Sequence, residues 1–304
     1  MNQNRFSPVV LFVFSRPDHT KKTVDALLAN PEACNTDLIV YADAARSEKD
    51  VAAVEAVREI FSDLRGFKSV TIHLREKNYG LARNIMEGVT QVTAMYGRAI
   101  ILEDDIVTSP AFLNYMNAAL DKYENIKEVW HISGWNYPIK SNENLPETFF
   151  WRTMNCWGWA TWADRWQHFK KNPGELVNSW SSDDISRFNL DGTHDFWEQV
   201  VANHKGRLNT WAIFWYATIF AHKGLCLNPT RSFVENIGND GSGENCGHDD
   251  IYKSNLGMKF DHGWPDDICE NSKILLMIKS FYKKTSPSII YRLIRKIKRV
   301  PDYP

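Results

Sequence analysis

The sequence predicts an α/β protein with a mostly parallel central sheet and helices on both faces. Between residues 9 and 136, short apolar runs alternate with segments whose apolar residues recur at helical spacing. This alternation is typical of successive strand–helix units. Polar or charged residues stand directly after several of the apolar runs, where strands would end. With 304 residues, 43% of them apolar, the chain is long enough to bury a sizeable core.

The first unit lies in "PVVLFVFSRPDHTKKTVDALLAN". Residues 9–14 form a continuous apolar run, as expected of a strand buried on both faces. Residues 16–18 predict the turn that follows. Val24, Leu27 and Leu28 supply the apolar stripe of a helix.

The next two units repeat this pattern. In the second, residues 38–42 predict a strand, and a helix follows from a cap near Ser47 to about Phe61. In the third, residues 69–74 predict a strand and a helix begins at about Leu81.

A fourth strand is predicted in "RAIILEDD" (residues 98–105), followed by a helix over residues 110–123 with proline in its first turn. "EVWHISGWN" (residues 128–136) predicts a fifth strand. Farther along the chain, residues 170–195 are polar and predict loops or short helices. Residues 209–229 predict a helix that leads into a short strand.

Two late segments have distinctive compositions. Residues 235–250 are rich in glycine, which predicts a flexible loop of the kind used as a lid. Residues 273–300 predict two basic amphipathic helices that are interrupted at Pro287.

Charge and composition exclude several classes of protein. The formal net charge of −1 argues against a nucleic-acid partner. Residues 273–304 carry nine Lys or Arg and one acid, a net of +8, which leaves −9 on residues 1–272. The five cysteines are widely spaced and odd in number, as expected of free thiols in a reducing compartment. With no signal-peptide pattern and no apolar run long enough to span a membrane, we expect a cytoplasmic protein.

The most informative stretch is "IILEDDIVTSP", in which Glu103, Asp104 and Asp105 follow an apolar run. Arg16, Asp43 and Asn78 also follow predicted strands, and ligands of parallel sheets bind beyond the carboxyl ends of strands. Mg²⁺ and Mn²⁺ take oxygen ligands, often one or two carboxylates together with substrate phosphates. The triplet therefore indicates a metal site, although solvated loop acids or the first-turn acids of a helix would have the same sequence.

Five segments together resemble a known family. "AIILEDDIVTSPAFLNYMNAAL" resembles the Glu-Asp-Asp segment of animal N-acetylglucosaminyltransferase I and its relatives, and of bacterial family 2 type sugar transferases. "PVVLFVFSRPDHTKKTVDALL", "NYGLARNIMEGV", "VWHISGWN" and "LNPTRSFVENIGNDGSG" are similar to other segments of these proteins, in the same order. The resemblance covers roughly residues 8–245 in pieces.

The resemblance implies a GT-A fold, a Rossmann-like arrangement that binds a nucleotide-sugar, and a divalent metal, Mn²⁺ or Mg²⁺. Residues 1–136 would form the nucleotide-sugar-binding half of the domain. Residues 137–271 would form an irregular, aromatic-rich acceptor half of the same domain, and residues 272–304 the basic C-terminal helices. The implied activity is transfer of a sugar, as a hexosyl or N-acetylhexosaminyl group, from a UDP-sugar to a glycan or lipid-linked glycan.

The resemblance also implies roles for single residues at the donor site. Arg16 would contact the nucleotide, and Asp43 would accept a hydrogen bond from the ring N–H of uracil. Asn78, Gly80 and Asn84 would lie near the phosphates and the ribose.

At the metal, Asp105 would be the direct ligand. Outside the resemblance, His248 in the polar loop is a candidate for a late additional ligand, with a solvated loop histidine as the alternative. Glu103 and Asp104 would support the ribose or the donor sugar and metal-bound water. The metal would neutralise the charge that develops on UDP as the glycosidic bond breaks.

The catalytic base does not follow from the resemblance. An inverting transferase needs a carboxylate to deprotonate the acceptor hydroxyl, and in the family it lies between tryptophans. Here "NTWAIFW" contains none, and Asn245 stands where many bacterial relatives carry a histidine. Glu198 and Asp240 are our candidates, with Asp195 and Glu235 behind them. A retaining mechanism, which needs no such base, also stays open.

Trp157 and Trp159 in "NCWGWATW" are candidates for stacking on the acceptor or the donor sugar, with a packed hairpin as the alternative. The basic segment 273–300 would contact an anionic membrane, or pack on the acidic body instead. Such an enzyme would build a surface polysaccharide, O-antigen or capsule.

The competing interpretations are a nucleotidyltransferase, which "FSRPDHT" disfavours because it lacks a glycine-rich phosphate loop, and a non-catalytic nucleotide- or sugar-binding module.

Overall fold

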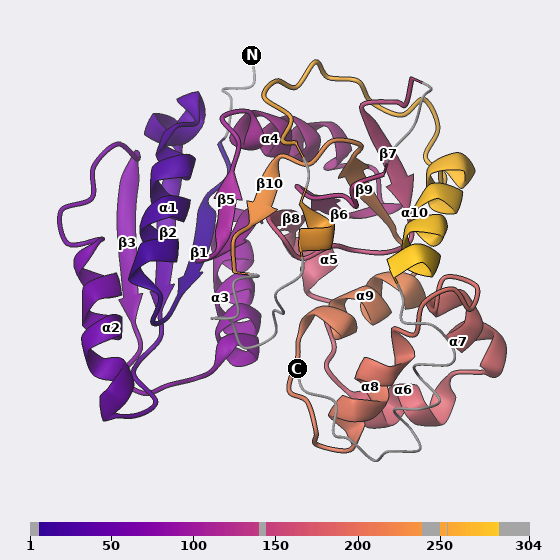
Figure 1. Cartoon of the computed structure of the whole chain (residues 1–304), viewed down its shortest axis with the longest axis horizontal. Coiled ribbons are helices and arrows are strands. Elements are labelled where there is room, and N and C mark those ends of the chain that lie inside the picture. The colour runs from indigo at the N-terminus through magenta and orange to yellow at the C-terminus, as the bar shows by residue number, and fades with distance from the viewer. Residues whose placement is uncertain (1–5, 140–143, 239–249, 254, 286–304) are drawn as a thin grey trace.

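The computed structural model describes residues 6–139, 144–238, 250–253 and 255–285. It confirms the predicted α/β class, with a central sheet of eight strands and helices around it (Figure 1). The strands lie in the order β3-β2-β1-β4-β8-β6-β9-β7, and β10 and β5 form a separate two-stranded sheet.

The described strands are β1 (Val9–Val13), β2 (Asp37–Ala42), β3 (Ser69–Leu74), β4 (Arg98–Glu103), β5 (Ile106–Thr108), β6 (Val129–Ser133), β7 (Thr148–Trp151), β8 (Trp159–Trp162), β9 (Leu225–Pro229) and β10 (Val234–Asn236). The described α-helices are α1 (Pro17–Leu28), α2 (Glu48–Glu59), α3 (Leu81–Tyr96), α4 (Phe112–Tyr123), α5 (Ala163–Trp166), α6 (Pro173–Ser179), α7 (Ser182–Phe188), α8 (Trp197–His204), α9 (Ala212–Ala221) and α10 (Ser272–Thr285). Two short 3-10 helices, η1 (Pro31–Asn35) and η2 (Asp250–Tyr252), complete the set.

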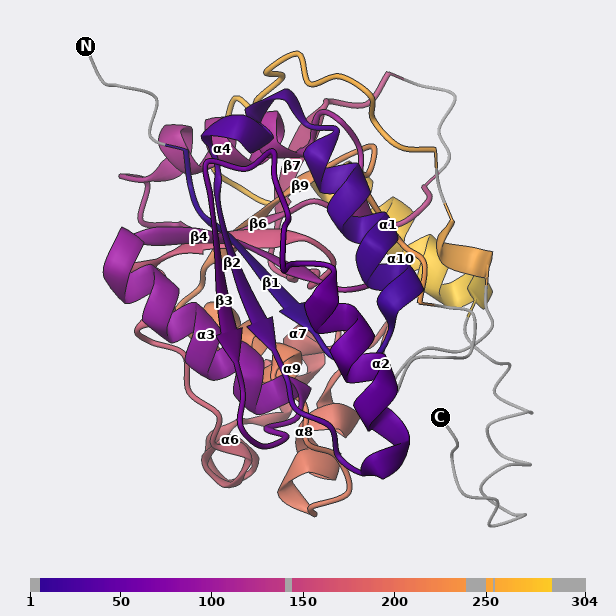
Figure 2. The same ribbon diagram turned by 90° about the vertical axis from the view of Figure 1, so that its left-hand side faces the viewer.

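The N-terminal half forms the parallel part of the sheet. Strands β3, β2, β1 and β4 are parallel neighbours, and β1 is buried along its whole length, as its apolar run predicts. Helices α1 and α2 lie on one side of these strands and α3 on the other (Figure 2). This alternation brings the carboxyl ends of β1, β2 and β4 to one edge, where the polar residues of the sequence follow them.

The second half of the sheet departs from the parallel pattern. Strand β6 is the predicted fifth strand, but β8 lies between it and β4 and runs antiparallel to both. Strands β7 and β8, which come from the aromatic segment after residue 136, were not predicted from the sequence. Strand β9, predicted after a helix, pairs parallel with β6 and antiparallel with β7.

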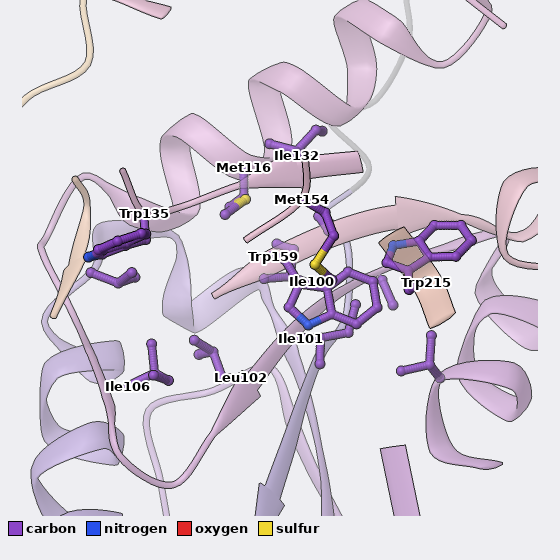
Figure 3. Close-up of a cluster of buried hydrophobic side chains, with 14 of the residues drawn as sticks. Ile100, Ile101, Leu102, Ile106, Met116, Ile132, Trp135, Met154, Trp159 and Trp215 are labelled. Carbon is purple, nitrogen blue, oxygen red and sulfur yellow. The ribbon is translucent and has the colours of Figure 1, made fainter. Parts of the chain in front are cut away.

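The core is continuous across both halves. Figure 3 shows Ile100, Ile101 and Leu102 of β4 in the same buried cluster as Trp159 of β8 and Trp215 of α9. Because β4 and β8 pair directly, the large aromatic side chains of the second half fill the space beside the parallel strands.

The C-terminal helix α10 confirms the first of the two predicted basic helices. Its Ile274, Ile278 and Tyr282 are buried, and the Tyr282 hydroxyl contacts that of buried Tyr137. The second predicted helix and Pro287 lie outside the described residues. Within the described residues, none of the helices combines the length and the apolar character needed to cross a bilayer.

Candidate functional site

The acid triplet lies at the carboxyl end of β4. The side chains of Asp104 and Asp105 are each only 7% exposed. Arg16, in the turn after β1, donates hydrogen bonds to both carboxylates, at 2.9 Å for Oδ2 of Asp105. Thr23 of α1 donates to the backbone carbonyl of Asp104 at 2.9 Å, so the first helix fixes the turn that carries the acids.

The charges at this site are not balanced. Burial and the neighbouring Asp105 and Asp104 raise the pKa of Glu103 well above its usual range. Burial also raises the pKa of Asp104, against the opposing effect of Arg16. Burial disfavours the charge on Arg16, but the two aspartates outweigh it and raise the pKa of the guanidinium. Three acids therefore share one arginine in a poorly solvated place.

A late segment of the chain covers the triplet. Strand β10 pairs antiparallel with β5, which begins directly after Asp105, and Ile237 donates to the Asp105 carbonyl at 2.9 Å. The next residue, Gly238, packs directly against the carboxylate of Asp105. A Cβ added there would overlap Oδ2 of Asp105 and lie 3.0 Å from Nη1 of Arg16. The start of the glycine-rich segment thus lies on the acids.

Asp43 organises a turn at the ends of β2 and β3. Its carboxylate is buried and accepts three backbone hydrogen bonds, from Ala44, Tyr79 and Gly80, at 2.9–3.0 Å. Asn78 donates to the Ala44 carbonyl at 2.7 Å. Gly80 has a φ of +71°, a conformation that favours glycine. The structure therefore brings Asp43, Asn78 and Gly80 together, as the sequence analysis expected of a shared site.

Asn84 lies in the first turn of α3, and its side chain is engaged within the protein. It is buried, and its Oδ1 accepts a hydrogen bond from Nε of Arg75 at 2.8 Å. The guanidinium groups of Arg75 and Arg83 lie 4.5 and 3.9 Å from the ring centroid of Tyr79. A phosphate or ribose contact by Asn84 would require its exchange for the bond with Arg75.

The two tryptophan candidates have different environments. Trp159 is fully buried, stacks between the rings of His131 and Trp211, and pairs with Ile101 in the sheet. It has no surface to offer a sugar, so the expectation of sugar contact at Trp159 is wrong. Trp157, two residues earlier, is half-buried.

The base candidates are scattered. Glu198 is exposed in the first turn of α8, which packs on α6 and α9 away from β5 and β10 (Figure 1). Asp195, just before that helix, accepts a hydrogen bond from the Glu198 N–H at 3.1 Å. Glu235 lies in β10 opposite Val107 of β5, and β5 begins directly after Asp105. Asp240, like the metal candidate His248 and the predicted loop around them, lies outside the described residues.

Gly238 and Thr23 also contribute to this site, and neither could be recognised from its sequence neighbours. Gly238 stood in the quoted "NIG" segment, but its role depends on the pairing of β10 with β5, two strands of three residues each. Strands this short leave almost no periodic signal. Thr23 could not be distinguished from the other residues of its helix, because the Asp104 carbonyl that its hydroxyl contacts lies 81 positions away in the sequence.

The residues present fit a divalent cation. Asp104 and Asp105 offer hard oxygen ligands, and Arg16 alone does not compensate the charge of the triplet. Among the described residues, no three His, Cys, Asp or Glu side chains converge as a complete ligand set. A cation here would therefore take its remaining ligands from water, from substrate phosphates or from the rest of the chain, as Mg²⁺ and Mn²⁺ commonly do.

Comparison with known proteins agrees with this picture at the level of family. Residues 1–184 match the family model described as the GNT-I family. No curated protein matches the chain. Among solved structures, TarS of S. aureus matches with a TM-score of 0.31 and 12% identity, over 46% of this chain and 23% of that one. The match thus spans about a quarter of the length of TarS.

Proposed function

The chain belongs to the GNT-I family of glycosyltransferases, and from this premise we propose that it transfers a sugar from a UDP-sugar to a glycan acceptor. The observation that carries the proposal is the acid triplet at the carboxyl end of β4, in which the buried Asp104 and Asp105 share Arg16 and Gly238 lies against Asp105. A divalent metal would supply the positive charge that the carboxylates bind, and the diphosphate of a nucleotide would supply the negative charge that Arg16 binds.

In the proposed donor complex, the nucleotide lies over the ends of β1 and β2. Within the described part of the chain, backbone N–H groups occupy three of the lone pairs of the Asp43 carboxylate, and the fourth could accept from the N–H of uracil. Nη1 of Arg16 is buried and has no hydrogen-bond partner within the described part of the chain, so it can donate to a phosphate. Asn78 and Gly80 stabilise the turn beside the proposed nucleotide site. Asn84 would contact the phosphates or the ribose after giving up its hydrogen bond with Arg75.

The metal would bind beside the diphosphate, with Asp105 as its direct protein ligand. Asp104 and Glu103 would orient its water molecules and the ribose or donor sugar, and His248 is the proposed late ligand. Bound there, Mn²⁺ or Mg²⁺ would neutralise the charge on the leaving UDP. The protein's own part is to hold the acids in place through Arg16, Thr23 and the pairing of β10 with β5.

For the catalytic base we propose Asp240, which follows Gly238 by two residues. Glu198 is the weaker candidate, since α8 packs on α6 and α9. Glu235 shares the β10 strand that approaches the triplet and is the alternative to test. With such a base the reaction inverts the anomeric centre.

We place the enzyme in surface polysaccharide synthesis, O-antigen or capsule, on a lipid-linked glycan at the inner face of the membrane. The support is the exposed face of α10, which presents Lys273, Lys283 and Lys284 together with Leu276, 67% exposed. Five more basic residues follow in 286–304. A basic surface of this kind is attracted to anionic lipid.

The test is a thermal-shift titration with UDP, GDP, CDP and ADP, each with and without Mn²⁺. A ligand that binds only the folded protein at 100 times its Kd stabilises it by about 2.7 kcal/mol. We expect a rise in melting temperature with UDP that requires Mn²⁺ and disappears in Asp105→Asn. Asp25→Asn, an exposed acid on α1, is the matched control and should keep the shift.

Slow release of UDP from UDP-N-acetylglucosamine or UDP-glucose would then distinguish an enzyme from a binding module. Metal-dependent UDP binding with no turnover of any donor would favour the non-catalytic interpretation. The absence of a shift with every nucleotide would contradict the proposal.

A further inference from the structure

A group of three aromatic side chains lies at the same edge of the sheet as the acid triplet. Trp135 follows β6, Trp157 precedes β8, and Tyr252 belongs to η2. The ring centroids are 4.6 Å apart for Trp135 and Trp157, 5.7 Å for Trp157 and Tyr252, and 5.9 Å for Trp135 and Tyr252. All three pairs meet edge to face, so the rings brace one another.

The pairing of the strands places this group beside the acids. Ile101 of β4 lies opposite Trp159 of β8, and both Glu103 and Trp157 stand two residues beyond that pair, in the same direction along the sheet. Gly158 lies against Leu102 and Val234, since a Cβ added to it would lie 3.3 Å from one and 2.9 Å from the other. Gly134 donates to the Gly158 carbonyl at 2.6 Å, which brings the end of β6 to the same edge.

The three rings differ in exposure: Trp135 is buried and supports the other two, which are partly open to solvent. Trp135 is only 4% exposed and also contacts Tyr137. Figure 3 shows it on the side of Ile106, apart from Trp159 and Trp215. Trp157 and Tyr252 are half-buried and retain accessible surface. They contrast with Trp159, which the core covers completely.

The order of the strands separates this surface from the proposed nucleotide site. Asp43 and Arg16 follow β2 and β1, the triplet lies at the end of β4, and Trp157 precedes β8 on the opposite side of β4. A nucleotide held by Asp43 and Arg16 and a ligand held by Trp157 would therefore lie on either side of the acids. This is the arrangement needed for a donor and an acceptor that meet at one reacting bond.

We propose that Trp157 and Tyr252 form a stacking surface for a pyranose ring of the acceptor glycan, next to the triplet and supported by Trp135. The C–H face of a pyranose is apolar enough to cover an aromatic ring, while its hydroxyl groups remain hydrated or hydrogen-bonded. The proposal rests on the proposed function. It assigns Trp157 to the acceptor rather than to the donor sugar, and it adds Tyr252 as a second stacking residue and Trp135 as their support.

The test is saturation-transfer NMR on the full chain with methyl glycosides of glucose, galactose, mannose and N-acetylglucosamine, with UDP and Mn²⁺ present. We expect ring C–H signals from at least one glycoside, reduced roughly fivefold to tenfold in Trp157→Ala and in Tyr252→Ala. Tyr252→Phe keeps the ring and should keep the signal. Trp180→Ala, which removes a half-buried tryptophan that stacks on Trp197 elsewhere, is the matched control.

The same samples report the UDP-dependent rise in melting temperature, which all four variants should retain. Retention of that rise with no glycoside signal in the wild type, or with a signal that Trp157→Ala leaves unchanged, would overturn the stacking surface alone. A glycoside signal that depends on Trp157, without any effect of UDP, would support the stacking surface and count against the UDP-sugar donor. Loss of the UDP effect in Trp157→Ala would show misfolding, and Trp157→Leu, which fills more of the space but has no ring to stack on a sugar, would then replace it.

Discussion

At the scale of single residues, Gly238 is the tightest point of the candidate site. An added methyl group there would overlap the carboxylate of Asp105 and approach Arg16. We predict that Gly238→Ala displaces the carboxylate or the β10 backbone, and that Mn²⁺-dependent UDP affinity falls by roughly tenfold or more. Isothermal titration calorimetry with UDP and Mn²⁺ measures this effect.

Gly174→Ala is the control for that substitution, because an added Cβ in α6 would meet its nearest neighbours at an ordinary 3.7 Å. It should leave UDP affinity unchanged. Wild-type affinity in Gly238→Ala would mean that the site tolerates a shift of the late segment.

His131 sets a pH dependence for the stability of the core. It is fully buried: Nε2 donates to the Asn155 carbonyl at 3.0 Å, and Nδ1 accepts from Nε1 of Trp215 at 3.2 Å. Burial lowers its pKa to about 3. The folded protein therefore keeps this ring neutral at pH values where the unfolded chain, with a usual pKa near 6.5, binds a proton.

The consequence is a loss of stability in acid. The contribution of His131 is fully present above pH 6.5 and declines as the pH falls towards 3, by about 2 kcal/mol between pH 7 and pH 5. Urea unfolding of the wild type and His131→Gln at several pH values isolates this contribution, because the variant should lose correspondingly less. His204→Gln, an exposed histidine, should follow the wild type. Parallel curves for the wild type and His131→Gln would refute the assignment.

Some residues of the candidate site could be recognised from the sequence alone, and others only from contacts between distant segments. The carboxylates and Arg16 could be predicted, because each stands directly after a predicted strand. The burial of Trp159 could not be, since alternate residues of an aromatic strand look alike until its neighbours on both sides are known. Gly238 could not be recognised as a contact of Asp105 without the pairing of β10 and β5.

At the scale of elements, Arg165 clamps the connection between α4 and β6. It is almost completely buried and donates to four backbone carbonyls, those of Tyr123, Glu124, Ile126 and Val129. We predict that Arg165→Met lowers the free energy of unfolding by about 3 kcal/mol or more, because several carbonyls lose a charged donor. Arg165→Lys should recover only part, since one ammonium group cannot reproduce the fork of a guanidinium.

Urea unfolding measures both variants, and Arg65→Met is the control, with its side chain 87% exposed. The UDP-dependent rise in melting temperature should persist in all three proteins. A cost below about 1 kcal/mol for Arg165→Met would mean that water replaces the arginine at the helix end.

The helix α10 changes how the membrane proposal has to be tested. Because Ile274, Ile278 and Tyr282 are buried in the body, deletion of the whole basic segment would expose part of the core. Truncation after Thr285 removes five basic residues and one acid and leaves α10 intact. We expect the truncated protein with Lys283→Glu and Lys284→Glu to lose more than about tenfold in binding to phosphatidylglycerol vesicles, at about 1 kcal/mol per basic residue.

Flotation with phosphatidylcholine vesicles, which lack net charge, should show little binding of either protein. The double substitution Lys49→Glu and Lys77→Glu, made in the truncated chain, changes the charge as much as the Lys283→Glu and Lys284→Glu pair but at exposed positions elsewhere, and is the control matched to that pair. Equal flotation of the full chain and of the truncated chain with both lysine substitutions would leave α10 as a purely structural helix.

Elements with a strong periodic signal were the ones that sequence could predict. The parallel strands and helices α1 to α3 are close to their expected positions, and α9 followed by β9 confirms the predicted helix and strand. Strands β7 and β8 were not predicted because each has only four residues, too few for a periodic pattern. Their aromatic side chains also occur both in cores and on binding surfaces, so composition does not show which side is buried. Their position depends on contacts with β9 and β4, distant in sequence.

At the scale of the whole molecule, β8 joins the two halves that the sequence analysis distinguished. It comes from the aromatic half and completes the hydrogen bonding of β4 in the parallel half. We therefore predict a single cooperative unfolding transition. All 12 tryptophans lie after residue 129, so tryptophan fluorescence follows the second half, while far-UV circular dichroism follows the helices of both.

The two probes should give coincident transitions, and the calorimetric and van't Hoff enthalpies should agree. Two separated transitions would mean that residues 1–136 and the remainder fold as independent units.

The position of β8 also has a consequence for synthesis on the ribosome. Strand β6 is made about 30 residues before β8, so for a time β4 and β6 are both available with an open edge and no strand between them. Their direct association would give a sheet of the wrong order, and an open edge is also a site for association with other chains. The nascent chain must therefore keep these two edges apart, or exchange an early pairing for the final one, until residues 159–162 have emerged.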